Sequence, residues 1–202
     1  MEKGLMLVVS GPAGSGKGTV NGLLIKTGDY TLSVSATTRA PRVGEVDGVN
    51  YHYITKEEFL NKISSGEMLE YTEYCGNYYG TIKKEAEAIL ETGKNLILEI
   101  EVEGAKNIKT KYPDAVLVLL LPPSYSIQEK RLRARGTETE DKILLRLKRA
   151  KEEVELAGLY DYVVYNHDGG AADAAAKIAA IVEAEKSSIK RNPDIIKNFF
   201  AE

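Results

Sequence analysis

The feature that most constrains the fold is a short apolar segment that leads directly into a glycine-rich loop. Residues 5–9 (LMLVV) precede residues 11–19 (GPAGSGKGT), which contain the pattern G-x-x-x-x-G-K. The length and β-branching of the apolar segment predict a buried strand, and a helix is predicted from Lys17 to about Lys26. Glycines let successive backbone N–H groups face an anion, and the start of the helix adds partial positive charge. The sequence therefore predicts a phosphate-binding loop between a strand and a helix.

This loop departs from its common form at one position. Ser or Thr usually follows the lysine as a magnesium ligand, but Gly18 stands there and Thr19 comes one residue later. We expect Lys17 to reach the outer phosphates, and any Mg²⁺ to be held mainly by phosphate oxygens and water. The alternative is an ordinary glycine-rich turn without a ligand, which the flanking strand and helix disfavour.

Along the rest of the chain, short apolar segments alternate with helical patterns. Such alternation predicts a doubly wound α/β fold with a parallel sheet. Residues 39–84, rich in tyrosine, and residues 131–149, rich in arginine, break the alternation, so we predict that both are lobes inserted into the core. Further strands are predicted at residues 32–36, 96–100, 115–121 and 162–165, a hairpin at 68–79, and helices at 55–64, 82–91, 105–110, 126–133, 140–156 and 171–188.

Composition excludes several classes of protein. The net charge of −3 excludes a global basic field for nucleic acid, and no apolar run approaches the roughly 20 residues that a membrane span needs. The single cysteine, Cys75, excludes an intrachain disulfide and a cysteine-based zinc site. The N-terminus does not resemble a signal peptide. We therefore expect a cytoplasmic protein that binds neither nucleic acid nor membrane.

All but one of the arginines fall into two clusters. Arginine binds phosphate through a planar, permanently charged fork, so two clusters beside a lysine-bearing loop suggest two phosphorylated substrates rather than one. The alternative is surface salt bridging with nearby glutamates. We expect Arg146 and Arg149 to share one helix face, opposite an apolar stripe of Ile143, Leu144, Leu147 and Val154. The clusters are Arg39 with Arg42, and Arg131, Arg133, Arg135, Arg146 and Arg149.

Several separate motifs, in order, carry a family resemblance. Over roughly residues 4–190 the chain resembles guanylate kinase, an ATP-dependent nucleoside monophosphate kinase. The matching stretches are residues 10–19 (SGPAGSGKGT), 35–53 (SATTRAPRVGEVDGVNYHY), 68–81 (MLEYTEYCGNYYGT), 98–105 (LEIEVEGA), 131–137 (RLRARGT) and 162–166 (YVVYN).

The resemblance implies a P-loop doubly wound core with an inserted monophosphate-binding lobe and a helical lid. The core would comprise residues 1–36, 85–124 and 157–202, the GMP-binding lobe residues 37–84, and the lid residues 125–156. ATP and GMP would be the substrates, Mg²⁺ would accompany ATP, and the chain would act as a monomer or homodimer. The alternatives are a non-catalytic guanylate kinase-like module that binds phosphorylated peptides, and a kinase for another phosphorylated acceptor.

The resemblance also assigns roles by position, although it leaves the metal ligands unknown. Lys17, Arg135 and Arg146 would be catalytic. ATP would be bound by Gly11, Pro12, Ala13, Gly14, Ser15, Gly16, Lys17, Gly18 and Thr19, with Asn166 near its adenine and ribose. The GMP phosphate would be held by Arg39, Arg42, Tyr51 and Tyr79, and guanine would be read by Ser35, Glu70, Thr81 and Glu101.

Guanine recognition has a chemical basis in these residues. Guanine presents N1–H and N2–H₂ donors that a carboxylate such as Glu70 accepts as a pair, whereas adenine has no such pair on that edge. The family usually has Asp at the position of Glu101, so its guanine contact is expected to shift or to need a water.

The C-terminal tail is predicted to contain a further helix that carries large apolar residues. Residues 192–194 (NPD) are typical of a helix start, with Asn192 as the capping residue. Large apolar residues at a terminus are expected to dock on the core or on another subunit. Those of the tail are Ile195, Ile196, Phe199 and Phe200.

Overall fold

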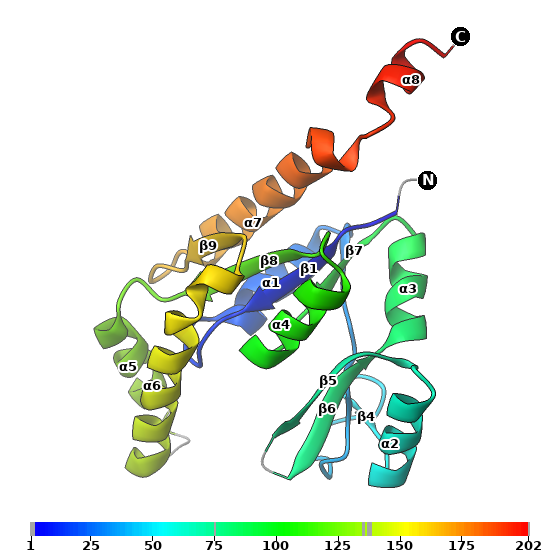
Figure 1. Cartoon of the computed structure of the whole chain (residues 1–202). Helices are drawn as coiled ribbons and strands as arrows, with labels where there is room; N and C mark the ends of the chain where they lie inside the picture. The colour runs from blue at the N-terminus through cyan, green and yellow to red at the C-terminus, as the bar shows by residue number, and fades with distance from the viewer. Residues whose placement is uncertain (1–2, 75, 135, 137–138, 202) are drawn as a thin grey trace.

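A computed structural model describes residues 3–74, 76–134, 136 and 139–201 of the chain. Its centre is a five-stranded sheet in which every neighbouring pair of strands is parallel (Figure 1). In spatial order the strands are β2 (Tyr30–Leu32), β7 (Asn95–Leu98), β1 (Met6–Ser10), β8 (Val116–Leu121) and β9 (Tyr162–Tyr165).

Helices cover both faces of this sheet. Alternate side chains of β1 point to opposite faces, so Leu7 and Val9 join one apolar core while Met6 and Val8 join the other. All of β1 is buried, as expected for a parallel sheet between two helical layers. The doubly wound α/β fold is thereby confirmed. The first core is covered by α1 (Lys17–Lys26) and α7 (Ala171–Lys186), and the second by α3 (Lys83–Glu91) and α4 (Val102–Lys111).

A smaller sheet forms the tyrosine-rich lobe at the lower right of Figure 1. The helix α2 beside it begins with a reciprocal capping box: Thr55 accepts from the Glu58 N–H, and Glu58 accepts from the Thr55 N–H. Phe59 of this helix is fully buried against the sheet. The elements are β3 (Ala36–Thr37), β4 (His52–Tyr53), α2 (Lys56–Ser64), β5 (Met68–Tyr74) and β6 (Asn77–Ile82), of which β5 and β6 form the predicted hairpin.

The single strand predicted at residues 32–36 is wrong. The chain there divides between the two sheets, because β2 ends at Leu32 and β3 begins at Ala36. The N–H of Ser33 still donates to the carbonyl of Ile97 in the large sheet, at 2.9 Å. Beyond it Ala36 pairs with Gly80 of β6 in the lobe. This short segment therefore connects the core to the lobe.

The arginine-rich segment forms two helices at the opposite side of the molecule, α5 (Tyr125–Ala134) and α6 (Glu140–Glu155), followed by the short helix η1 (Ala157–Leu159). Leu132 of α5 packs against Ile143 and Leu147 of α6. The wider stripe predicted on α6 is wrong, since Leu144 and Val154 are exposed. With a single neighbouring helix in this small cluster, α6 buries only a narrow face.

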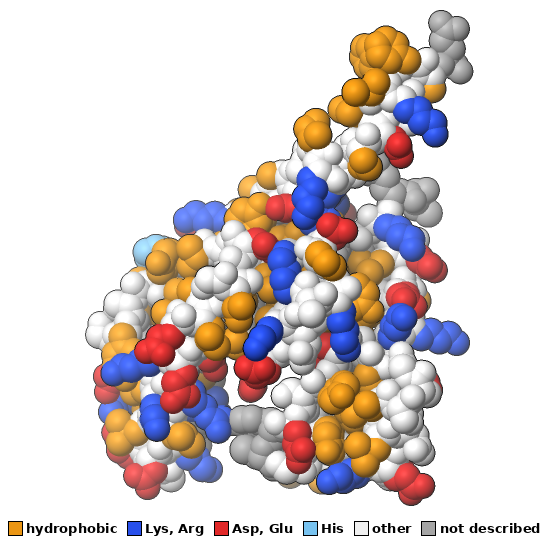
Figure 2. Space-filling model, viewed as in Figure 1, with side chains coloured by type: hydrophobic (Ala, Val, Ile, Leu, Met, Phe, Trp, Pro, Cys, Tyr) orange, Lys and Arg blue, Asp and Glu red, His pale blue; other side chains and the backbone are white. Residues whose placement is uncertain are grey.

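The C-terminal tail leaves the body as η2 (Ile189–Arg191) and α8 (Ile195–Phe199). The residue before helix α8 is Asp194, which makes no capping hydrogen bond through its side chain, rather than the predicted Asn192. The Asn192 side chain instead donates to the carbonyls of Lys186 and Ser188. Figures 1 and 2 show α8 pointing away from the core with its apolar side chains uncovered. The expected docking on the core is therefore wrong: Phe199 is 80% exposed.

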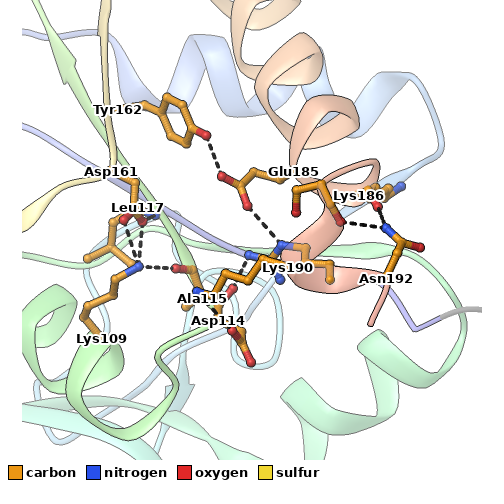
Figure 3. Close-up of polar contacts among 12 residues, drawn as sticks. Lys109, Asp114, Ala115, Leu117, Asp161, Tyr162, Glu185, Lys186, Lys190 and Asn192 are labelled. Atoms are coloured by element: carbon orange, nitrogen blue, oxygen red, sulfur yellow. Dashed lines mark hydrogen bonds and ion pairs between the residues drawn. The ribbon is translucent and has the colours of Figure 1, made fainter. Parts of the chain in front are cut away.

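A polar network fixes the direction in which this tail leaves (Figure 3). Arg191 donates from Nε to Glu185 Oε2 at 3.0 Å and from Nη2 to the carbonyl of Asp114. The hydroxyl of Tyr162 donates to the other oxygen of Glu185. The tail is thus anchored to β9, α7 and the start of β8, so its exposed helix begins from a defined position. Within the described residues, no helix has the length and apolarity to cross a membrane.

Candidate active site

A cleft of about 1200 Å³ lies between the core, the lobe and the lid. Figure 2 shows the molecule hollowed between the lid on the left and the lobe on the right. Most of the residues proposed from the sequence meet here, from segments far apart in the chain. They are the loop at 11–19, Ser35, Arg39, Arg42, Tyr51, Glu70, Tyr79, Glu101 and Arg146.

The glycines of the phosphate loop are required by its backbone. Gly11 and Gly16 have φ angles of 149° and 91°, in the region that favours glycine. A Cβ on Gly11 would lie 2.1 Å from the carbonyl oxygen of Leu120, and one on Gly16 would lie 2.3 Å from Nδ2 of Asn166. The loop therefore holds its shape only without side chains at these positions. The Lys17 ammonium donates to the carbonyl of Gly11 at the cleft wall.

Two side-chain amides support the phosphate loop by donating to its backbone carbonyls. Asn166 is buried and donates from Nδ2 to the carbonyl of Ser15 at 2.8 Å. Gln128 of α5 donates to the carbonyl of Ala13 at 2.9 Å. Sequence reasoning missed Gln128, because nothing in its local pattern distinguishes it from any buried helical glutamine. Asn166 thus contacts the phosphate loop and is not among the residues that line the cleft.

Arg131 also supports the loop rather than facing the cleft. Its guanidinium donates to the carbonyls of Gly14 and Asn166, at 3.3 and 2.8 Å, and to Asp168 at 2.8 Å. This use of its donors departs from the predicted anion-binding role. The salt bridge holds the pKa of Asp168 below its ordinary value, so the pair remains charged at neutral pH.

A second cationic part of the cleft lies in the lobe. The Arg39 guanidinium carbon is 5.5 Å from the ring centroid of Tyr51, and the rings of Tyr51 and Tyr79 meet edge to face at 6.1 Å. Arg39 also forms a bidentate salt bridge with Glu45, both distances being 3.0 Å. The sequence analysis did not single out Glu45, although an acid only three residues after Arg42 could have been expected to pair with this arginine cluster. The lobe thus contributes two arginines and two tyrosines to the cleft.

Glu70 is the most buried acid of the cleft, at 2% exposure. Burial raises its pKa to about 7, partly offset by Thr81, whose hydroxyl donates to Oε1 at 2.9 Å. Thr81 itself is fully buried behind Glu70. A Cβ on Gly104 would lie 3.0 Å from Oε2 of Glu70, so a small residue is needed there. A carboxylate so placed can accept two N–H donors from a planar base.

Two further acids follow strand β7. Asn21, one helical turn beyond Lys17, donates from Nδ2 to Glu99 Oε2 at 2.7 Å, and Glu99 lines the cleft. Partial burial raises the pKa of Glu101, while the charges of Lys17 and Arg146 act to lower it. Among the described residues no group of three or more His, Cys, Asp or Glu could hold a metal ion by itself.

Comparison with known proteins assigns the chain to a family. The family model described as guanylate kinase matches residues 3–185. The chain belongs to the guanylate kinase family. The guanylate kinases of Clostridium perfringens (strain SM101 / Type A) and Clostridioides difficile (strain 630) are 48% and 47% identical to it over 191 and 203 residues. These matches cover 94% and 100% of this chain, and 88% and 98% of those proteins.

A solved structure agrees with this assignment to the guanylate kinase family. The crystal structure of guanylate kinase from Anaplasma phagocytophilum matches with a TM-score of 0.75 and 33% sequence identity. The match covers 95% of this chain and 90% of that chain. The resemblance carried by the sequence motifs is therefore confirmed, and so is the P-loop kinase fold.

The lid contributes cleft residues beyond those assigned from the guanylate kinase resemblance. Lys142, Arg149 and Glu153 line the cleft beside Arg146. Arg133 instead pairs with Glu129 and Glu140 at the surface, which confirms the salt-bridge alternative for this arginine. Arg135 and Cys75 lie outside the described residues.

Proposed function

We propose that this protein transfers the γ-phosphoryl group of ATP to GMP, giving ADP and GDP. One observation carries the proposal: a single cleft joins a phosphate-binding loop to a second cationic pocket that ends at the buried carboxylate of Glu70. A plain NTPase needs only the first of these sites. The close match to guanylate kinases over nearly the whole chain agrees with this reaction.

The test is an acceptor screen with purified protein, ATP and magnesium. ADP release is expected with GMP, and little is expected with AMP, UMP, a ribose phosphate or water. Release of ADP with AMP alone would favour the kinase for another acceptor. Tight binding of a phosphorylated peptide without ADP release would favour the non-catalytic module, which the intact loop with Lys17 disfavours.

We propose that the ATP phosphates lie along residues 11–19 and that Lys17 and Arg146 neutralise the phosphoryl group during transfer. Phosphoryl transfer depends on positioning and on charge stabilisation at the moving group. Support comes from Lys17 and Arg146 lying on the same cleft. Arg135 is proposed as a third cationic group, on the strength of the family resemblance alone. We propose that Asn166 lies near the adenine and ribose of ATP, while its amide also supports the loop.

For the acceptor, we propose that the phosphate of GMP is bound by the cationic pocket and its guanine by the buried end. Glu70 would accept N1–H and N2–H₂ of guanine, with Thr81 holding the carboxylate in place. Ser35 and Glu101 would complete the base contacts from the cleft wall. The phosphate would be bound by Arg39, Arg42, Tyr51 and Tyr79.

Mg²⁺ is the proposed cofactor, bound together with ATP. The residues present fit such an ion: Glu99 supplies a hard oxygen at the cleft, while Gly18 supplies none. When bound, the ion would neutralise phosphate charge. The chain's own part is to hold Glu99 in place through the amide of Asn21.

We propose further that the lobe (37–84) and the lid (125–156) close on the core (1–36, 85–124 and 157–202) when both nucleotides bind. The cleft between them is wide and polar, and transfer to GMP rather than to water requires that water be excluded. A decrease in the radius of gyration on adding GMP and a non-hydrolysable ATP analogue would support closure. No change in small-angle scattering would contradict it.

The reaction is proposed to take place in the cytoplasm, by a monomer or a homodimer. The uncovered apolar residues of α8 support the dimer. Deleting residues 193–202 is expected to halve the mass measured by light scattering. Since α8 does not pack on the core, any fall in the melting temperature should come from loss of the dimer and should vary with protein concentration. An unchanged mass would contradict docking between subunits.

A further inference from the structure

The two arginines of the lobe lie on a chain segment with little regular structure. Between β3 and β4, residues 38–51 contain turns and an isolated bridge. Arginine side chains are long and lose substantial rotamer entropy when they bind an anion from a mobile state. A binding site on such a segment therefore needs something that fixes its arginines beforehand.

Glu45 makes the contacts that organise this segment. Its Oε1 accepts from Arg39 Nη2, and its Oε2 accepts from Arg39 Nη1, both at 3.0 Å. Oε2 also accepts from the backbone N–H of Arg42 at 2.7 Å and from the hydroxyl of Tyr53 at 2.8 Å. One carboxylate thus joins both ends of the segment to its middle.

The count of donors on Arg39 shows which edge this arrangement leaves for a ligand. A guanidinium carries five N–H donors. Two go to Glu45, and one more from Nη1 goes to the carbonyl of Ala40 at 2.7 Å. The donors not engaged by these two partners are Nε–H and the second N–H of Nη2, which lie on the same edge. Since Arg39 lines the cleft, this edge matches two oxygens of a phosphate there.

We propose that Glu45 is a positioning residue for the acceptor phosphate: it fixes Arg39 by its Nη1–Nη2 edge so that the Nε–Nη2 edge is preset for that phosphate. The inference rests on the proposed function, because it assumes a phosphorylated acceptor in the lobe. It adds a residue that acts on the phosphate only through Arg39.

Glu45 keeps Arg39 in position when the phosphate binds; it is not a competing anion that the phosphate displaces from Arg39. Its other partners, the Arg42 N–H and the Tyr53 hydroxyl, tie the segment together whether or not the cleft is filled. The salt bridge and these donors lower the pKa of Glu45 to about 2, so it stays ionised throughout the neutral range. If Glu45 competed with the phosphate for Arg39, removing its charge would tighten GMP binding. If Glu45 positions Arg39, removing its charge weakens GMP binding.

The test compares GMP with guanosine, its analogue without phosphate, by calorimetry on the full chain. Glu45→Gln is expected to raise the Kd for GMP about tenfold and to leave the Kd for guanosine within about twofold. Glu57→Gln, an exposed glutamate in the same lobe, is the matched control and should change neither. Equal weakening of both ligands would indicate a merely structural role, and tighter GMP binding would indicate a competitor. Either result overturns the proposal.

A double-mutant cycle checks that Glu45 acts through Arg39. Once Arg39→Ala is present, adding Glu45→Gln should weaken GMP binding by less than about twofold. Additive losses would overturn the proposal. The failure of the proposed function is distinguishable, because it would appear in the wild type as no turnover of GMP. Wild-type turnover with an unaffected Glu45→Gln variant would reject the positioning role alone.

Discussion

The two phosphate sites proposed for the cleft are built from different groups. The loop at 11–19 is proposed to bind through its backbone N–H groups, in a shape that depends on glycines and on the buried amides of Asn166 and Gln128. The lobe presents the side chains of Arg39 and its neighbours, held by the charge of Glu45. The first site depends on backbone geometry and the second on charge. Substitutions should therefore affect one nucleotide and leave the binding of the other intact.

The largest expected effect comes from the one side-chain cation of the loop. Lys17→Ala should lower kcat on the order of 10³-fold, because a preorganised charge at the transferring phosphoryl is lost. GMP binding to the free protein, measured by calorimetry, should stay within about twofold. Lys26→Ala, an exposed lysine at the end of the same helix, is the control and should retain full activity. A loss of GMP affinity in Lys17→Ala would show that the two sites are not separable.

The next largest effect is expected at the far end of the lobe. Glu70→Gln should lower kcat/KM for GMP about 100-fold, since an amide cannot accept both guanine donors. The KM for ATP should not change, and the ratio of GMP to AMP use should fall by a similar factor. Steady-state kinetics with both acceptors measures this. An unchanged GMP/AMP ratio would remove Glu70 from guanine recognition.

Two glycines of the phosphate loop, two positions apart, test whether its backbone geometry requires glycine. Gly16→Ala forces a side chain into a left-handed conformation and against Asn166, which should cost about 1–3 kcal/mol of folding stability. It should also weaken ATP binding and leave GMP binding unchanged. In Gly18→Ala the added Cβ meets no atom within 4 Å, so it should be nearly neutral. Thermal melting and ATP titration measure both variants, and equal effects would contradict the glycine requirement.

The same contrast explains what the sequence could predict. The phosphate loop was predictable because its glycines, its apolar strand and the helix from Lys17 are adjacent in the chain. Most of the large sheet followed from apolar segments such as residues 115–121, and its strands β1, β7, β8 and β9 match their predicted ranges within a few residues. Local pattern suffices where one segment builds a feature.

The structure of the lobe and the side-chain contacts that support the phosphate loop could not be predicted from local sequence patterns, because they join residues that are distant in sequence. Arg131 resembled an anion-binding arginine until its partners, Asp168 and two carbonyls, were known. The strand predicted at 32–36 failed because its two ends pair with different sheets. The tail was expected to dock on the core or on another subunit, and the core is excluded because Arg191, bonded to Glu185 and to the carbonyl of Asp114, holds the tail as it leaves the body. In each case the outcome depends on residues distant in sequence.

The smallest expected effect concerns pH and applies to the lobe only. Because burial raises the pKa of Glu70 to about 7, its carboxyl binds guanine donors fully only when ionised. Guanosine, which carries no phosphate to titrate, should bind about tenfold more tightly at pH 8 than at pH 6. Calorimetry measures this, and Glu70→Gln should bind guanosine equally at both values. A pH-independent wild type would show that Glu70 is already ionised at pH 6.

Ionisation of Glu70 should affect folding stability and guanosine binding in opposite directions as pH rises. The folded protein retains the Glu70 proton between the unfolded value of about 4.5 and the folded value of about 7. Because the folded state binds more protons than the unfolded state in this range, the contribution of Glu70 to the free energy of unfolding falls as pH rises through it. Glu70→Gln should therefore flatten this part of the stability profile, measured by urea unfolding. The charge that binds guanine thus destabilises the empty lobe, whereas backbone N–H donors, such as those proposed for the phosphate loop, carry no charge that titrates.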